Sequence, residues 1–163
     1  MIAVYWGRFN PPHKGHMALI KKIVKEVNLL IVAIGEADTK NTKRNPFSGS
    51  ERKKMMKTFL KEERIKHVKV VLIPTAKTFS KSITNLFKVC PKFDVLYADK
   101  ETIIKKMKNR VKIRRINRIG EVSATKIREA IAHDKDWEHL TGRSVAKIIR
   151  KINGIKRIKR TCL

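Results

Sequence analysis

Short apolar runs alternate with amphipathic segments along the chain. Runs rich in Val, Ile, Leu and aromatic residues predict five strands, at residues 2–6, 29–34, 68–73, 93–97 and 111–116. The second run is continuously apolar, which is typical of a strand covered on both faces. The fifth run is basic, so we expect it nearer an edge of the sheet.

Apolar residues between these runs recur at the three- and four-residue spacing of a helix. This spacing predicts helices at 17–27, 51–63, 81–89 and 102–107, from Ser123 or Thr125 to about 132, and at 144–152. A basic tail follows the last of them. Ser48 or Ser50 is expected to cap the second helix.

The alternation of strands and helices, with no repeat or linker, predicts an α/β fold. We expect one domain, residues 1–163, with a basic C-terminal helix and tail from about residue 143. The sheet should be Rossmann-like, doubly wound, five-stranded and mostly parallel, with helices on both faces. Ligands bind such sheets beyond the carboxyl ends of the strands, so the loops after strands one, two, four and five should share one crevice.

Residues 7–16, Gly-Arg-Phe-Asn-Pro-Pro-His-Lys-Gly-His, join the first strand to the first helix. A helix start carries unpaired N–H groups and the positive end of the helix dipole, so it readily binds phosphate. Gly15 would let an anion approach the backbone, and His13, His16 and Arg8 would supply donors. The alternative is a pair of histidines that cap the helix or fill the core. The pattern favours a phosphate site.

A second helix start is expected opposite the first, at residues 123–128, Ser-Ala-Thr-Lys-Ile-Arg. Its N–H groups, the hydroxyls of Ser123 and Thr125, and Arg128 suit the outer phosphates of a triphosphate. The alternative is an ordinary capped helix with a surface arginine. Arg44 lies in a long polar loop that could fold over phosphate, whereas Arg52 could pair with an acid and hold that loop.

Several blocks together resemble one family. Residues 7–16 match Gly-x-Phe-x-Pro-x-His-x-Gly-His, the signature of the nucleotidylyltransferase superfamily. Residues 44–52 resemble the Asn-Pro-Phe-Thr-Ala-Gly-Glu-Arg segment of archaeal-type nicotinamide-nucleotide adenylyltransferases, and residues 121–128 their Tyr-Ser-Gly-Thr-Glu-Ile-Arg segment. Residues 136–140 and 151–155 also resemble segments of this family, so the resemblance covers nearly the whole chain.

The resemblance implies transfer of an adenylyl group from ATP to nicotinamide mononucleotide, with formation of NAD and release of pyrophosphate. Such a protein must position anions and neutralise developing charge, which histidines and arginines can do without a nucleophilic residue. Mg²⁺ would be held largely by the phosphates and water. The family also suggests a homo-oligomer.

The resemblance assigns roles to single residues as well. The expected catalytic residues are His13, His16 and Arg128. The expected ATP-binding residues are Gly7, Arg8, Phe9, Gly15, Arg44, Ser123 and Thr125. No side chain is expected to ligate a metal.

The part of the site that selects the acceptor departs from the family. Alignment backward from residues 93–94 places Ser82 where the family carries a tryptophan near the nicotinamide, and Ala98-Asp99-Lys100 replaces Ser-Gly-Asn. Adenylyl or cytidylyl transfer to another phosphorylated acceptor therefore stays open. Trp137 is expected in the core or as a packing lid.

Composition adds an excess of positive charge. Forty Lys and Arg against 14 Asp and Glu give a net charge of +26. Such a charge attracts polyanions, so a non-catalytic nucleic-acid-binding module on the same fold is an alternative function. The basic residues are spread along the chain, which favours solvated outer helix faces instead. The same charge would oppose assembly of subunits unless bound anions screen it.

The remaining compositional features indicate the cellular setting. Two cysteines, Cys90 and Cys162, are too few for a disulfide framework or a metal site. No apolar run reaches 18 residues, and the N-terminus reads as a strand rather than a signal peptide. We therefore expect no membrane partner and a cytoplasmic location.

Overall fold

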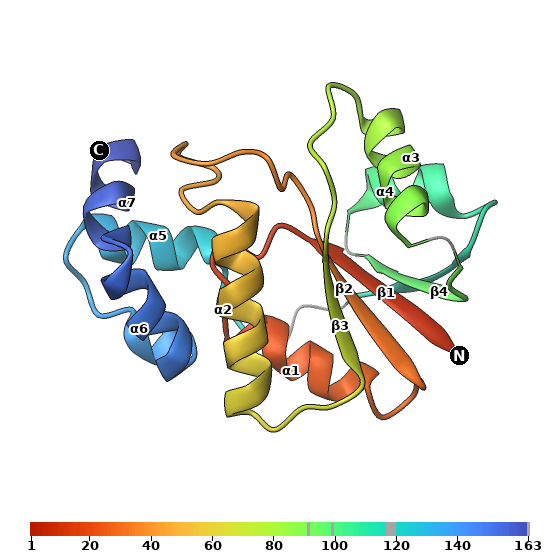
Figure 1. The fold of residues 1–163 in the computed structure, drawn as a ribbon, viewed down its shortest axis with the longest axis horizontal. Helices are drawn as coiled ribbons and strands as arrows, with labels where there is room; N and C mark the ends of the chain where they lie inside the picture. Colours follow the sequence, from red (N-terminus) through yellow and green to blue (C-terminus); the bar gives the residue numbers. More distant parts are fainter. Residues whose placement is uncertain (91, 99, 117–119, 163) are drawn as a thin grey trace.

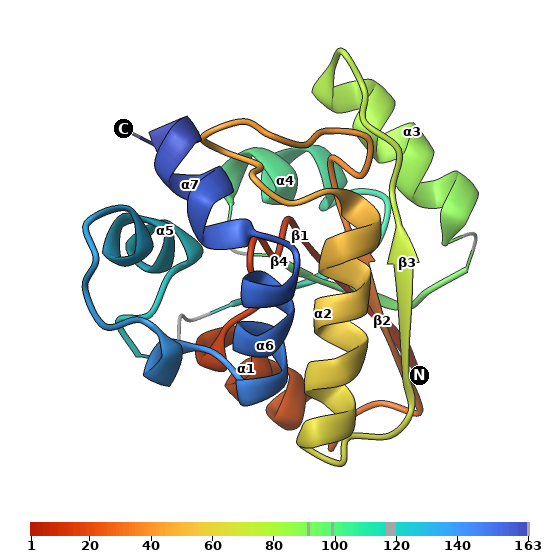
Figure 2. The ribbon, with the colours of Figure 1, turned by 60° about the vertical axis from the view of Figure 1, so that its left-hand side comes forward.

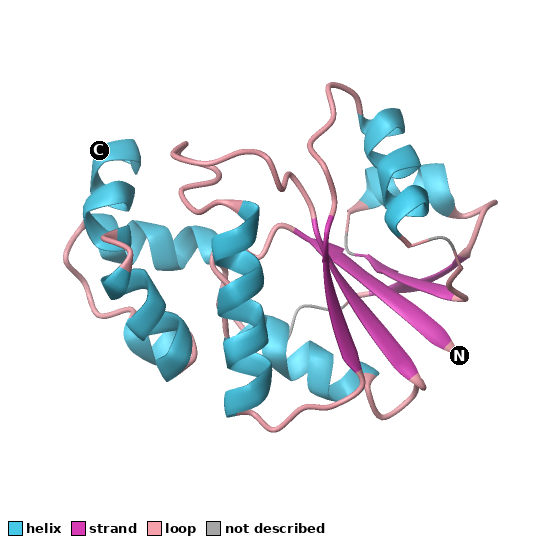
Figure 3. Cartoon of the chain, viewed as in Figure 1, coloured by secondary structure: helices cyan, strands magenta, loops and turns pink. Residues whose placement is uncertain are grey.

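The computed structural model describes residues 1–90, 92–98, 100–116 and 120–162. Its centre is a five-stranded sheet with strand order β3-β2-β1-β4-β5, in which every neighbouring pair is parallel (Figures 1 and 3). The strands are β1 (Ile2–Gly7), β2 (Leu29–Ile34), β3 (Val68–Leu72), β4 (Val95–Ala98) and β5 (Lys112–Arg115). All five predicted strands are confirmed, and the basic β5 lies at an edge as expected.

Helices connect and follow the strands. They are α1 (Lys14–Ile23), α2 (Gly49–Glu62), α3 (Phe79–Val89), α4 (Glu101–Met107), α5 (Ala124–Ala132), α6 (Arg143–Lys151) and α7 (Gly154–Cys162), with a 3-10 turn η1 (Glu138–Leu140). Ser48 caps α2 and Ser123 caps α5, each by accepting a backbone N–H three residues on. The first helix begins three residues before the predicted start, because His13 rather than a later residue is its N-cap.

The two faces of the sheet are covered by different helices, as Figures 1 and 3 show. Alternate side chains of β2 lie on opposite faces of the sheet. Leu30 and Val32 pack with α1, α2 and α5–α7, whereas Ile31 and Ala33 pack with α3 and α4. Both sets of side chains are buried, so the continuous apolar run of β2 follows from burial on both faces. The prediction of helices on both faces is confirmed.

The C-terminal tail corrects one prediction. Sequence periodicity predicted a basic tail after residue 152, but the tail folds as α7 beside α5 and α6 (Figure 2). Ile158 is fully buried, and Ile155 packs against the same cluster three residues earlier. Arg157 forms an ion pair with Glu51 of α2 at 2.7 Å. Tertiary packing of these few residues makes a helix from a stretch whose composition is mainly cationic.

The chain direction creates a crevice between β1 and β4. The chain runs outward from β1 through β2 to β3, then returns to β4 and continues to β5. Connections after β1 and β4 therefore leave in opposite directions, which opens a ligand site at their carboxyl ends. Gly7 and Ala98 mark those ends. Asp99 and residues 117–119, which the sequence also placed at this crevice, lie outside the described residues.

Two further expectations concern the cysteines and membranes. Cys90 and Cys162 are free thiols, and burial raises the pKa of Cys90 to about 11. Within the described ranges, no helix combines the length and the apolar character needed to cross a bilayer.

The role of α7 gives a first testable prediction. Replacing the fully buried Ile158 by Ala should lower the free energy of unfolding by about 2–5 kcal/mol, because the core loses apolar contacts and gains a cavity. The matched change of exposed Lys156 to Ala on the same helix should alter it by less than about 0.5 kcal/mol. Urea denaturation followed by circular dichroism measures both values. Equal, small effects would show that α7 does not stabilise the fold.

Candidate active site

A single cavity of about 680 Å³ occupies the carboxyl ends of the strands. All ten site residues expected from the sequence line it: Gly7, Arg8, Phe9, His13, Gly15, His16, Arg44, Ser123, Thr125 and Arg128. Residues after β1, β2, β4 and β5 contribute, as expected. Residues 73–76 after β3 contribute as well, which the sequence did not indicate.

The start of α1 is formed by its two histidines. His13 Nδ1 accepts the backbone N–H of His16 at 3.3 Å, and His16 Nδ1 accepts the backbone N–H of His13 at 3.2 Å. Their rings stack with centroids 3.5 Å apart. Because each Nδ1 is an acceptor, a neutral imidazole in either position carries its proton on Nε2. The capping alternative is therefore correct, and it coexists with a place in the cavity wall.

The loop between β1 and α1 is held from several directions. Asn10 is buried; its amide donates to the Phe47 carbonyl at 3.1 Å and its oxygen accepts the Phe47 N–H at 3.3 Å. Thr141 donates to the carbonyl of Pro12 at 2.7 Å. No spacing in the sequence marks Asn10 or Thr141 as a support, because their partners lie far along the chain. The loop that presents His13 is thus rigidly placed.

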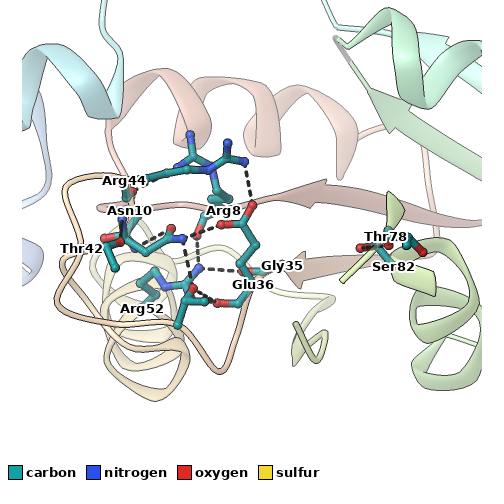
Figure 4. A network of polar contacts seen from close by, with 11 residues as sticks. Arg8, Asn10, Gly35, Glu36, Thr42, Arg44, Arg52, Thr78 and Ser82 are labelled. Atoms are coloured by element: carbon teal, nitrogen blue, oxygen red, sulfur yellow. Dashed lines mark hydrogen bonds and ion pairs between the residues drawn. The ribbon is translucent and has the colours of Figure 1, made fainter. Parts of the chain in front are cut away.

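Arg52 holds this loop to the end of β2. It is fully buried, and its guanidinium donates to five backbone carbonyls at 2.7–3.2 Å, those of Arg8, Gly35, Glu36, Phe47 and Ser48. Figure 4 shows Arg52 beside Arg8, Gly35 and Glu36. Burial lowers the pKa of Arg52 to about 10, so it is protonated at neutral pH. The expectation that Arg52 pairs with an acid is wrong, since its partners are carbonyls and no ion pair of Arg52 occurs within the described residues. The expectation that it holds the loop is confirmed.

The long loop after β2 carries Arg44 to the cavity. Arg44 forms an ion pair with Glu36 at 2.7 Å, and its carbonyl accepts a hydrogen bond from Arg8 at 3.0 Å (Figure 4). Burial alone would raise the pKa of Glu36, but the hydrogen bond from Asn45 and the charge of Arg44 outweigh burial and lower it. Glu36 is therefore ionised at neutral pH and keeps Arg44 at the cavity wall.

The start of α5 faces the same cavity as the start of α1. Ser123 caps α5 by accepting the N–H of Lys126 at 3.1 Å. Arg128, one turn further, is buried and donates to the Asn10 carbonyl at 2.8 Å and to the Thr125 hydroxyl at 3.3 Å. The alternative of a surface arginine is wrong. Arg128 thus links α5 to the loop that precedes α1.

Three guanidinium groups make the cavity strongly electropositive. The pKa of Arg8 is lowered first by burial and then by the charges of Arg44 and Arg128, although Glu36 opposes this. The pKa of Arg128 is lowered chiefly by burial, with a smaller effect of Arg44. Like charges that are held together and partly buried are stabilised by a bound anion. The cavity is thus suited to a polyphosphate.

The cavity also contains side chains that sequence reasoning did not assign. Trp6 and Phe79 line it as a nearly parallel pair. Ser82 and Lys100, which the sequence placed in the acceptor part of the site, line the cavity as well. An aromatic residue directly before Gly7 was the only sequence signal for Trp6. Trp137, by contrast, is buried in the core as expected.

Metal-ligating residues were not expected, and the described part of the chain contains no group of three or more His, Cys, Asp or Glu placed to hold an ion. The donors around the cavity are mainly cations and N–H groups. This set fits an anion that brings its own metal ion better than a metal held by the protein alone.

Comparison with known proteins identifies the family. The cytidylyltransferase-like family matches residues 4–130. The nicotinamide-nucleotide adenylyltransferase of Thermococcus kodakarensis is 32% identical over 161 residues, which cover 96% of this chain and 86% of that protein. The corresponding protein of Thermoplasma acidophilum is 33% identical over 156 residues, or 94% of this chain and 87% of that protein. The chain belongs to the nicotinamide-nucleotide adenylyltransferase family.

A solved structure supports the fold of this adenylyltransferase family member. A bifunctional NMN adenylyltransferase/ADP ribose pyrophosphatase from Francisella tularensis, complexed with AMP and a manganese ion, superposes with a TM-score of 0.80 at 16% identity. The superposition covers 98% of this chain and 52% of that protein, so this chain spans about half its length. At this identity the likeness concerns the fold alone.

Removing the Arg52 guanidinium tests the support of the active-site loops. Arg52 to Met should lower the free energy of unfolding by about 3 kcal/mol or more, because several buried carbonyls lose their donors at once. Lys54 to Met, the same chemical change at an exposed position of α2, should cost less than about 0.5 kcal/mol. Thermal and urea denaturation measure the difference. Similar values for the two variants would contradict a supporting role for Arg52.

Proposed function

We propose that this enzyme transfers the adenylyl group of ATP to nicotinamide mononucleotide, forming NAD and pyrophosphate. The observation that carries the proposal is the convergence of α1 and α5 on one cavity, locked by the 2.8 Å hydrogen bond from Arg128 to the Asn10 carbonyl. Two helix starts aimed at one place can hold a triphosphate between them. The names of the relatives support the choice of adenylyl donor and acceptor.

The reaction needs charge stabilisation rather than a covalent intermediate. A phosphate oxygen of the acceptor attacks the α-phosphorus of ATP, a new P–O bond forms, and the bond to the β-phosphate oxygen breaks in line. Negative charge grows on the oxygens of the α-phosphate and on the departing pyrophosphate. We assign the Nε2–H donors of His13 and His16 to the transferring phosphate. Ser123, Thr125 and Arg128 bind the pyrophosphate.

The remaining assignments concern binding. Arg8 and Arg44 bind phosphate oxygens, Gly15 allows close approach to the start of α1, and Gly7 and Phe9 shape the turn that leads to it. A Cβ on Gly7 would lie 3.0 Å from the Phe9 ring, so glycine suits this turn. Mg²⁺ enters with ATP, coordinated by phosphate oxygens and water, and neutralises charge on the triphosphate. We further propose that the protein acts in the cytoplasm as a homo-oligomer.

Replacing the histidines tests their catalytic role. His13 to Asn and His16 to Asn should each lower kcat about 10²- to 10³-fold, because each removes one donor to the transferring phosphate. Asparagine retains a capping side chain at position 13, so unfolding free energy should fall by no more than about 1 kcal/mol. Lys14 to Asn, at the exposed position between them, is the matched control and should change kcat less than about twofold. Full turnover by both histidine variants would overturn the assignment.

The acceptor and donor are tested together by pyrophosphate release. ATP and CTP are each combined with nicotinamide mononucleotide, nicotinate mononucleotide, ribose 5-phosphate and phosphocholine, with Mg²⁺ present. We expect ATP with nicotinamide mononucleotide to give a kcat/KM about tenfold or more above any other combination, which corresponds to about 1.4 kcal/mol of discrimination. A higher value for another pair would identify that pair as the substrates. No release with any pair would reject the enzymatic proposal.

A further inference from the structure

One surface of the cavity is not used by the phosphate chemistry. Trp6, near the end of β1, and Phe79, at the start of α3, face each other with ring planes 11° apart and centroids 6.1 Å apart. Both line the cavity, and both are only partly buried. Partly exposed aromatic rings in a cavity can stack on a planar ligand ring. We call Trp6 and Phe79 the aromatic surface.

The aromatic surface lies across the sheet from the helix starts. Trp6 and Phe79 pack with the cluster of α3 and α4, whereas α1 and α5 cover the opposite face. Figure 4 shows the same separation, with Arg8 and Arg44 at one side and, at the other, Ser82 of α3 and Thr78, the N-cap of that helix. A phosphate held by the helix starts would therefore have this surface at one end of the cavity.

A dinucleotide product requires two such ends. NAD carries one ring system at each end of its pyrophosphate, so the cavity must offer two surfaces for rings. Ile116 and Val122, in the segment that leads to α5, supply apolar lining beside the second helix start. The aromatic surface belongs to the core cluster on the other face of the sheet, together with Ile73 and Ile103, which also line the cavity. It is thus placed to receive the ring of the acceptor.

The start of α3 carries an aromatic residue close to the position where the family has a tryptophan. Ser82 stands where the family carries a tryptophan, and it lines the cavity, with its hydroxyl donating to the Thr78 carbonyl at 3.2 Å. Phe79 lies three residues earlier, hence on the same helix face one turn away. An aromatic ring is therefore present on this face of α3, displaced by one turn, and Trp6 adds a second ring from β1.

Neighbouring residues hold both rings of the aromatic surface. A Cβ on Gly35 would lie only 3.0 Å from Trp6 Nε1, so the absence of a side chain at the end of β2 accommodates the indole. Lys106 of α4 places its Nζ 5.6 Å from the Phe79 ring centroid, a cation–π contact. Gly35 and Lys106 thus contribute to the placement of the two rings.

We infer that Trp6 and Phe79 bind the pyridine ring of the acceptor nucleotide and thereby determine acceptor affinity, in place of the tryptophan expected at position 82. The inference rests on the proposed function and specifies its acceptor site. The pyridinium ring of nicotinamide mononucleotide is cationic, and the negative face of an indole attracts such a ring. A strongly basic chain can hold a cationic ring in this way without an acidic partner.

Kinetics of matched variants test the inference. Trp6 to Leu and Phe79 to Leu should each raise the KM for nicotinamide mononucleotide about 5- to 100-fold, the range expected for loss of one stacked ring, while the KM for ATP changes less than about twofold. Trp6 to Phe should recover most of the loss. Phe87 to Leu is the control, because Phe87 is a partly buried phenylalanine of the same helix that stacks on Phe93 and is absent from the lining.

Ribose 5-phosphate separates ring binding from phosphate binding. It presents the sugar and phosphate of the acceptor without the ring, so its inhibition constant against nicotinamide mononucleotide should be the same in the parent and in Trp6 to Leu. A parallel loss of affinity for ribose 5-phosphate would mean that the substitution disturbs the phosphate site, and the inference would fail.

Fluorescence provides a readout without turnover. The chain has two tryptophans, and Trp137 is buried in the other core cluster. Nicotinamide mononucleotide should quench the parent protein, and Trp6 to Leu should abolish this quenching. If pyrophosphate is released with ATP and this acceptor but KM and quenching ignore Trp6, the inference is rejected and the proposed function stands. If no acceptor supports pyrophosphate release in the parent, both are rejected.

Discussion

The buried charge of Arg52 is the constraint on which the active-site geometry depends. A guanidinium removed from water is costly unless its donors are satisfied, and here five backbone carbonyls satisfy them. Those carbonyls belong to the ends of β1 and β2 and to the turn before α2, so one side chain ties three segments together. Because the loop from Gly7 to α1 cannot move without breaking these bonds, the start of α1 has a fixed position relative to the sheet.

Two further hydrogen bonds hold the loop before α1 to α5 and to the residue after η1. Arg128 reaches from α5 to the Asn10 carbonyl, and Thr141 fixes the neighbouring Pro12 carbonyl. Arg8, Arg44 and Arg128 line one cavity, where burial lowers the pKa of Arg8 and of Arg128, and the carboxylates of Glu36 and Glu129 partly offset this at Arg8 and Arg128 respectively. Mutual repulsion of these cations is tolerated because the supports are rigid. Binding of a polyphosphate would reduce this repulsion, and the reduced repulsion would stabilise the complex.

The two ends of the cavity follow different physical rules. Phosphate recognition needs N–H groups, imidazoles and guanidiniums in short segments, and residues 7–16 and 123–128, which resemble segments of the family, carry such groups. Ring recognition needs only an aromatic face of suitable size, which several positions can supply. The proposed binding of the acceptor ring by Trp6 and Phe79 is therefore compatible with the proposed phosphate site at the two helix starts. A sequence that differs from the family in the ring-binding part of the cavity can therefore still resemble it in the phosphate-binding part.

Local sequence determined the strands, most helix limits and the residues that line the cavity at the starts of α1 and α5, because apolar periodicity, capping serines and the motif at 7–16 are encoded by near neighbours. Burial of Arg52 among carbonyls, the support of Pro12 by Thr141, and the folding of α7 over Ile158 depend on partners as far as 129 residues away. The pairing of Trp6 with Phe79 likewise needs β1 and α3 to meet. These contacts follow no regular spacing along the chain. Only the tertiary structure therefore decided that Arg52 supports the loops, that Arg8, Arg44 and Arg128 line the cavity, and that Trp6 and Phe79 meet there.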